Sequence, residues 1–184
     1  MNGPENPSTE QRAAAARETA RREAQRLARD TGANVISHPV LPGAPDIRDV
    51  EPLAGAAAAR DLENAARRTA RDYIARARQA GRDWTQIGTA LGLTPGADQP
   101  GATPADAAWT YAAGPPETDA PWRPRTFAWT CQACGRAVTD QGPDAGPPSD
   151  AEPGHAPGCP SLAVKTAAWD AAWAAIDSEW EPGQ

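Results

Sequence analysis

The chain has 184 residues, and although 40% of them count as hydrophobic, most of these are alanine. Leu, Ile, Val and Phe together supply only 18 residues, whereas Pro and Gly supply 36. This composition excludes a single dense core through the whole chain and a large α/β enzyme, and it favours small helical units joined by flexible segments. The net charge of −6 combines +2 in residues 1–92 with −8 in residues 93–184, so indiscriminate binding to nucleic acid is not expected.

The first ten residues hold neither a basic cluster nor an apolar run, and no stretch approaches the ~20 apolar residues of a membrane span. Three cysteines without a secretory signal are expected to stay reduced. We therefore expect a soluble cytoplasmic protein.

Residues 1–52 are expected to form an Ala/Arg-rich helix followed by a Pro-rich linker. Ser8-Thr9-Glu10-Gln11 matches a capping box, which opens a helix that runs to about Asp30. Prolines 39, 42, 45 and 52 then predict the linker. His38 lies there with no second ligand nearby, and we interpret it as an ordinary loop histidine.

A second helix is expected from about Leu53 to Ala80. Small and apolar residues share one of its faces: Leu62, Ala66, Thr69, Ala70, Tyr73 and Ala77. A stripe of arginines follows the opposite face: Arg60, Arg67, Arg71, Arg78 and Arg82. This arginine stripe has two interpretations, a solvated helix face or a surface that contacts the phosphates of duplex DNA.

The next segment predicts a short helix whose buried face holds Trp84, Ile87 and Leu91, with Asp83 as its N-cap and Gly92 at its C-terminus. From residue 77 to residue 92 the pattern is Ala-Arg-x-x-Gly-x-x-Trp-x-x-Ile-Gly-x-Ala-Leu-Gly. It resembles the helix-turn-helix segments of small regulatory proteins in high-GC bacteria. The resemblance covers about residues 74–112 and implies a trihelical, DNA-binding unit, which we place at residues 53–114.

The third helix of this unit would start at Thr103-Pro104-Ala105-Asp106, after an apparent insertion at residues 95–102. It occupies the place of the recognition helix but contains no Arg, Lys, Asn or Gln, the side chains that normally reach base edges. This absence supports an alternative function, a protein–protein adaptor that keeps the helix-turn-helix scaffold without reading DNA.

A Pro-rich linker at residues 115–125 leads to a second module, residues 126–184, which contains all three cysteines. Cys131-x2-Cys134 is followed, after 20 residues, by His155-x3-Cys159. Gly135 after the second cysteine is typical of a zinc knuckle, in which backbone N–H groups bond the thiolates. The alternation of Phe127 and Trp129 before this turn predicts a short hairpin that carries the first ligand pair.

The order of hairpin, knuckle and a last ligand at a helix start resembles a treble-clef zinc finger. It implies a structural Zn²⁺ held by Cys131, Cys134, His155 and Cys159. Two alternatives remain open, a redox pair of Cys131 with Cys134 and ordinary free thiols.

An acidic helix is expected from Ser161 to about Glu179. Its apolar residues form a heptad-like seam with Thr166: Leu162, Trp169, Trp173, Ile176 and Trp180. The seam either packs inside the chain or binds a partner, including a second copy of the chain.

The sequence therefore predicts a mainly α fold, with a helix-turn-helix-like unit, a small zinc-knuckle hairpin and a C-terminal helix. No nucleophile with a base, phosphate loop or supported pair of carboxylates emerges, and we expect no enzyme. The expected function is that of a DNA-associated regulatory or accessory protein with a structural zinc site.

Overall fold

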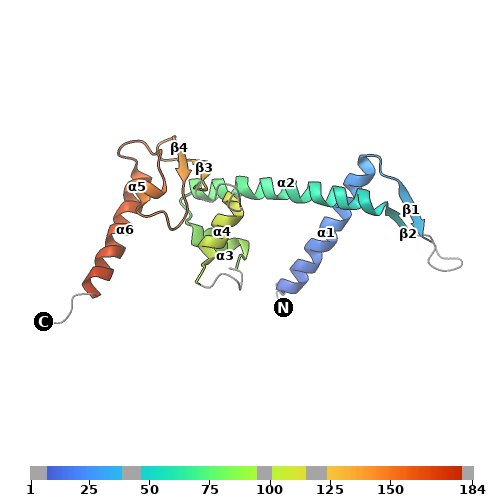
Figure 1. Cartoon of the computed structure of the whole chain (residues 1–184), viewed down its shortest axis with the longest axis horizontal. Coiled ribbons are helices and arrows are strands. Elements are labelled where there is room, and N and C mark those ends of the chain that lie inside the picture. The colour runs from blue at the N-terminus through green and yellow to red at the C-terminus, as the bar shows by residue number, and fades with distance from the viewer. Residues whose placement is uncertain (1–7, 39–46, 95–100, 115–123, 180–184) are drawn as a thin grey trace, which may run out of the picture. The chain divides into compact units, whose positions relative to one another are not determined.

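The computed structural model describes residues 8–38, 47–94, 101–114 and 124–179, and these residues form a mainly α fold as predicted (Figure 1). Six helices and two antiparallel hairpins occur within these ranges. The chain divides into two compact units, Met1–Ala70 and Arg71–Gln184. None of the described helices is both long enough and apolar enough to span a membrane.

The first unit is built around α1 (Thr9–Asp30), which starts at the predicted capping box. The Ser8 hydroxyl accepts a hydrogen bond from the Gln11 N–H, and the Gln11 side chain accepts one from the Ser8 N–H. Most of α1 is exposed, and its buried residues Ala24 and Ala28 pack with Val50 and Ala58. Alanine dominates this small core, as the composition predicts.

A hairpin lies where the sequence predicts only a linker. Its strands, β1 (Val35–His38) and β2 (Ile47–Val50), pair antiparallel, with Val35 opposite Val50. The linker prediction is wrong for residues 35–38 and 47–50, which form these strands, and for Pro52, which is the first residue of α2. Prolines 39, 42 and 45 lie outside the described residues. His38, expected in a loop, is the last residue of β1.

Helix α2 (Pro52–Gln79) has nearly the predicted bounds, but its predicted apolar face is only partly buried: Leu62, Ala70 and Ala77 are half-buried, and Ala66 and Thr69 are exposed. Its buried residues are Ala58, Ile74 and Arg78, whereas Tyr73, expected on the apolar face, is 64% exposed. Ile74 packs in one core with Trp84 and Ile87, so contacts with α3, which the periodicity of α2 alone does not show, decide which side of α2 is buried there.

Helices α3 (Trp84–Leu91) and α4 (Pro104–Ala113) pack against each other in the second unit. Asp83 and Thr103 are their N-caps, each in a full capping box, and Gly92 ends α3 with a left-handed φ of 64°. A Cβ atom on Gly88 would lie 2.1 Å from the Pro104 carbonyl oxygen, so only glycine permits this crossing. Leu91, predicted to be buried, is 43% exposed because it lies one turn beyond the crossing.

Residues 74–113 and 127–162, which we expected to belong to separate modules, share one core. Strands β3 (Phe127–Thr130) and β4 (Ala137–Asp140) form the predicted hairpin, followed by α5 (Pro148–Ala151) and α6 (Pro160–Glu179). The Trp84 ring lies edge-on to Trp109 at 5.2 Å and to Phe127 at 5.7 Å between centroids. Strand β3 therefore completes the core that α3 and α4 begin.

Candidate metal centre

The turn between β3 and β4 positions the first cysteine pair. The Cys131 N–H donates to the Arg136 carbonyl at 2.9 Å, and the Gly135 N–H donates to the Cys131 carbonyl at 2.7 Å. Gly135 has a φ of 68°, which the tight turn requires. These bonds fold the chain back within four residues and bring Cys131 and Cys134 to one side of the turn.

The segment between α5 and α6 positions the second pair. His155 follows α5 by four residues, and Cys159 immediately precedes Pro160, the first residue of α6. The Cys159 N–H donates to the Ala156 carbonyl at 3.1 Å, which closes a turn through Gly158 at a φ of 73°. The last cysteine therefore lies at a helix N-terminus, as the sequence predicts.

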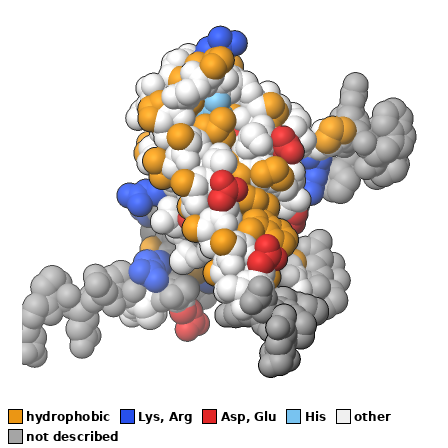
Figure 2. Space-filling view, turned by 90° about the vertical axis from the view of Figure 1, so that its left-hand side faces the viewer, with side chains coloured by type: hydrophobic (Ala, Val, Ile, Leu, Met, Phe, Trp, Pro, Cys, Tyr) orange, Lys and Arg blue, Asp and Glu red, His pale blue; other side chains and the backbone are white. Residues whose placement is uncertain are grey.

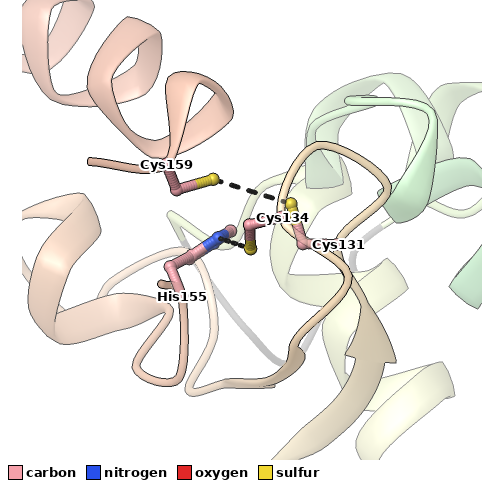
Figure 3. Close-up of side chains that lie close together, drawn as sticks. All are labelled: Cys131, Cys134, His155 and Cys159. Carbon is pink, nitrogen blue, oxygen red and sulfur yellow. Dashed lines mark hydrogen bonds between the residues drawn. The ribbon is translucent and has the colours of Figure 1, made fainter. Parts of the chain in front are cut away.

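All four predicted ligands come together (Figure 3). One Sγ or ring nitrogen from each residue lies within 4.8 Å of every other. The Cys131 Sγ is 3.8 Å from the Cys159 Sγ, and the Cys134 Sγ is 3.8 Å from the His155 Nδ1. All three cysteines are free thiols, and this arrangement is compatible with a metal site.

Backbone amides favour the thiolate form of Cys134. The N–H groups of Ala156 and Arg136 lower the pKa of this thiol to about 6, so it is largely ionised at neutral pH. Burial instead raises the pKa of Cys131, which is only 1% exposed. The β3–β4 turn supplies the Arg136 N–H and the segment between α5 and α6 supplies the Ala156 N–H, so both ligand-bearing segments stabilise the Cys134 thiolate.

The carboxylate of Glu152, which the sequence analysis does not identify, contacts the imidazole of His155. The Nε2 atom lies 3.4 Å from Oε2 of Glu152, while Nδ1 faces Cys134. The ring is also edge-on to Trp129, at 5.8 Å between centroids. A carboxylate behind a ligating histidine fixes its tautomer and orientation, so Glu152 belongs to the candidate metal centre.

Glu152 connects the candidate metal centre to two cations. Lys165, in α6, donates to both carboxylate oxygens at 2.7 Å, and Arg78, in α2, donates to Oε1. Burial alone would raise the pKa of Glu152, but Arg78 and Lys165 outweigh it and hold that pKa below its ordinary value. The carboxylate is therefore ionised at neutral pH and neutralised from two sides.

Arg78 lies inside the second unit, so its placement in an exposed arginine stripe is wrong. Its residue surface is 4% exposed, and its guanidinium bonds Asp140, with Nε at 3.0 Å and Nη2 at 2.7 Å from Oδ2. The guanidinium carbon also lies 5.0 Å from the centroid of Trp84 and 5.6 Å from that of Trp129. Arg78 is therefore unavailable to a DNA phosphate. Helical periodicity places it opposite the apolar residues but cannot reveal buried acids far along the chain.

The other arginines of the predicted stripe are exposed: Arg60, Arg67, Arg71 and Arg82. Arg67 forms an ion pair with Glu63 at 3.4 Å, four residues earlier. Helix α4, which we expected in the place of a recognition helix, is largely buried through Ala105, Ala108 and Trp109. Contact with DNA by the four exposed arginines stays a prediction.

The predicted apolar seam of α6 is partly buried in its first half and exposed in the described part of its second half. Leu162 packs against the core and Trp169 is partly buried, whereas Trp173 and Ile176 are 49% and 48% exposed. Trp180 lies outside the described residues. The first half of the seam therefore packs inside the unit, and the described part of its second half does not.

Comparison with known proteins found no matching family model, no similar curated protein and no similar solved structure.

Proposed function

We propose that Cys131, Cys134, His155 and Cys159 bind one structural Zn²⁺. The observation that carries this proposal is the 3.8 Å separation between the sulfurs of Cys131 and Cys159. Two thiolates of a tetrahedral zinc site, each about 2.3 Å from the metal, are about 3.8 Å apart. A disulfide, with sulfurs about 2.05 Å apart, would need a different geometry.

The chemistry of the donor set supports zinc and a structural role. Three thiolates and one imidazole form a closed four-ligand set, which leaves no position for a substrate or a reactive water. Bound zinc would join the β3–β4 turn to the start of α6. Zinc sites of this kind contribute roughly 10 kcal/mol or more to folding at neutral pH, which suits a chain with few large apolar residues.

For the whole chain we propose a non-enzymatic interaction protein in which zinc organises the second unit. Two observations favour an adaptor over a reader of DNA bases. Arg78 is engaged with Asp140 and Glu152, and α4 directs Ala105, Ala108 and Trp109 into the core. Free thiolates need a reducing compartment, and we propose the cytoplasm.

Zinc content tests this proposal. The chain, purified under reducing conditions without chelators, is expected to contain about one zinc per molecule by elemental analysis. Cys131→Ser and Cys159→Ser should lose the metal and unfold the second unit, whereas Gln132→Ser, an exposed change in the same turn, should do neither. Less than half an equivalent of zinc, or unchanged stability in both cysteine variants, would contradict it.

DNA association is the second candidate function, favoured by the exposure of Arg60, Arg67 and Arg71 on α2. It predicts binding to duplex DNA at ~50 mM salt that weakens steeply as salt rises. Replacing these three arginines with alanine should lower the slope of log affinity against log salt by about 0.9 for each phosphate that is no longer neutralised. No detectable binding at ~50 mM salt, or an unchanged slope, would rule out this function.

A further inference from the structure

The distal half of α6 leaves apolar side chains about half exposed, although the Trp173 ring contacts Trp169 at 5.8 Å between centroids. The proximal half is held by Leu162 in the core and by Lys165, which donates to Glu152. Every residue from 170 to 178 is exposed, including Trp173 and Ile176. Figure 2, which looks onto the side of Figure 1 where α6 lies, shows hydrophobic side chains next to acidic ones. An exposed tryptophan beside an exposed isoleucine on an ordered helix is typical of an interaction surface.

The same unit carries an apolar groove. It lies where the end of α2 meets α3, has a volume of about 520 Å³, and is walled by Ala77, Ile87 and Ala90. Arg82 and Gln86 also line it, and no acidic residue is among its described lining residues. The groove therefore combines an apolar floor with one positive charge.

The charges of the two surfaces are complementary. Beyond Lys165, α6 contains no Lys or Arg, and Asp170 and Asp177 lie one heptad apart beside the exposed pair. Pairing the distal half of α6 with another copy of itself would gather acidic side chains at one contact with no Lys or Arg to offset them, which is unfavourable. Docking α6 in the groove instead brings an acidic helix to Arg82.

We propose that Trp173 and Ile176 of one copy dock in the Ala77–Ile87–Ala90 groove of a second copy. If the second copy docks its own α6 in the first, the contact is reciprocal and closes as a twofold dimer. This inference deepens the proposed interaction role, and rests on it, by naming the partner as the chain itself.

The oligomeric state of the full zinc-loaded chain tests the inference. Analytical ultracentrifugation from about 1 to 200 µM should show a monomer–dimer equilibrium. Trp173→Glu and Ala90→Glu each disrupt both reciprocal contacts of a homodimer. A hot-spot loss is worth at least ~30-fold per contact, so each variant should raise the dimer Kd by about 1000-fold. Val164→Glu, a change at a 71% exposed residue of the same helix, is the matched control and should leave Kd within about 3-fold.

Mixing variants tests the geometry. Trp173→Glu keeps an intact groove and Ala90→Glu keeps an intact helix, so their mixture should form a heterodimer through one contact, although each alone is monomeric. Arg82→Glu and Asp177→Arg should each weaken the dimer, and combining them in one chain should restore part of the affinity. Circular dichroism should show the wild-type helix content in all variants.

Zinc content, measured on every variant, separates this inference from the proposed metal site. A wild-type chain that stays monomeric to 200 µM overturns self-docking even if it holds one zinc. If the dimer persists in Trp173→Glu, docking through α6 is wrong. If Trp173→Glu disrupts the dimer but Ala90→Glu does not, the groove is not the surface that α6 binds. If the chain is a monomer and Trp173 instead binds a basic helical peptide, the partner is not a second copy of the chain, and the proposed interaction role still holds. A dimer with the expected variant pattern but without zinc supports the inference and contradicts the metal proposal.

Discussion

Replacing Arg78 with methionine should destabilise the second unit strongly. Methionine keeps the length and much of the packing of the arginine stem but removes the guanidinium. That group donates to Asp140 and Glu152 and, through Nη1, to the Arg82 carbonyl at 2.9 Å. Its carbon also lies 5.0 Å from the centroid of the Trp84 ring and 5.6 Å from that of the Trp129 ring. The substitution therefore removes the only cation that joins both buried carboxylates among the described residues.

The magnitude follows from what remains around each carboxylate. Asp140 is 1% exposed and would keep the N–H of Gly142 at 3.0 Å and the Trp84 Nε1 at 3.2 Å, but no cation. Glu152 would keep Lys165 and His155. Leaving one buried carboxylate without its charged partner costs about 3–5 kcal/mol. We expect Arg78→Met to lower the free energy of unfolding of the second unit by this amount.

Urea denaturation followed by tryptophan fluorescence measures this change, because all seven tryptophans lie in residues 71–184. Arg71→Met, an exposed change on the same helix, should stay within about 0.5 kcal/mol. Arg78→Lys should be intermediate, since one ammonium cannot reproduce the forked contacts. If Arg78→Met lowers the free energy of unfolding by less than about 1 kcal/mol, the buried position of Arg78 is refuted and its assignment to the exposed arginine stripe stands.

Three further predictions follow from local geometry. Gly88→Ala should lower the free energy of unfolding by about 3 kcal/mol or more in urea denaturation, because its Cβ would meet the Pro104 carbonyl. An effect below about 1 kcal/mol would contradict the close contact between α3 and the start of α4. Thr103→Ala removes the N-cap of α4 and should cost about 1 kcal/mol in the same assay, and unchanged stability would argue against the cap. Glu152→Gln should weaken zinc binding about 10–100-fold in competition with a chromophoric chelator, whereas the exposed change Asp150→Asn should leave it unchanged. Equal affinities for these two variants would remove Glu152 from the metal centre.

The features that the sequence predicts correctly are local in the chain. Ser8, Asp83 and Thr103 each cap a helix through a residue three positions later. The knuckle at Cys131 and Cys134 likewise depends on hydrogen bonds within a few residues. Short-range chemistry of this kind can be read from spacing alone.

The features that the sequence does not reveal depend on distant partners. Arg78 is buried because Asp140 and Glu152, 62 and 74 residues later, meet it inside the core. Helical periodicity assigns it to an exposed face because it falls in line with arginines of α2 that are exposed. Glu152 is missed for the same reason, since nothing in an acidic, Pro/Gly-rich loop distinguishes the carboxylate that will face His155.

X-ray absorption at the zinc edge of the purified chain tests the central claim most directly. A site made by Cys131, Cys134, His155 and Cys159 should give three sulfur neighbours at about 2.3 Å and one nitrogen at about 2.0–2.1 Å. His155→Ala should remove the nitrogen scatterer of the imidazole and leave the sulfurs. A shell of oxygen and nitrogen with fewer than two sulfurs would contradict the proposed metal centre.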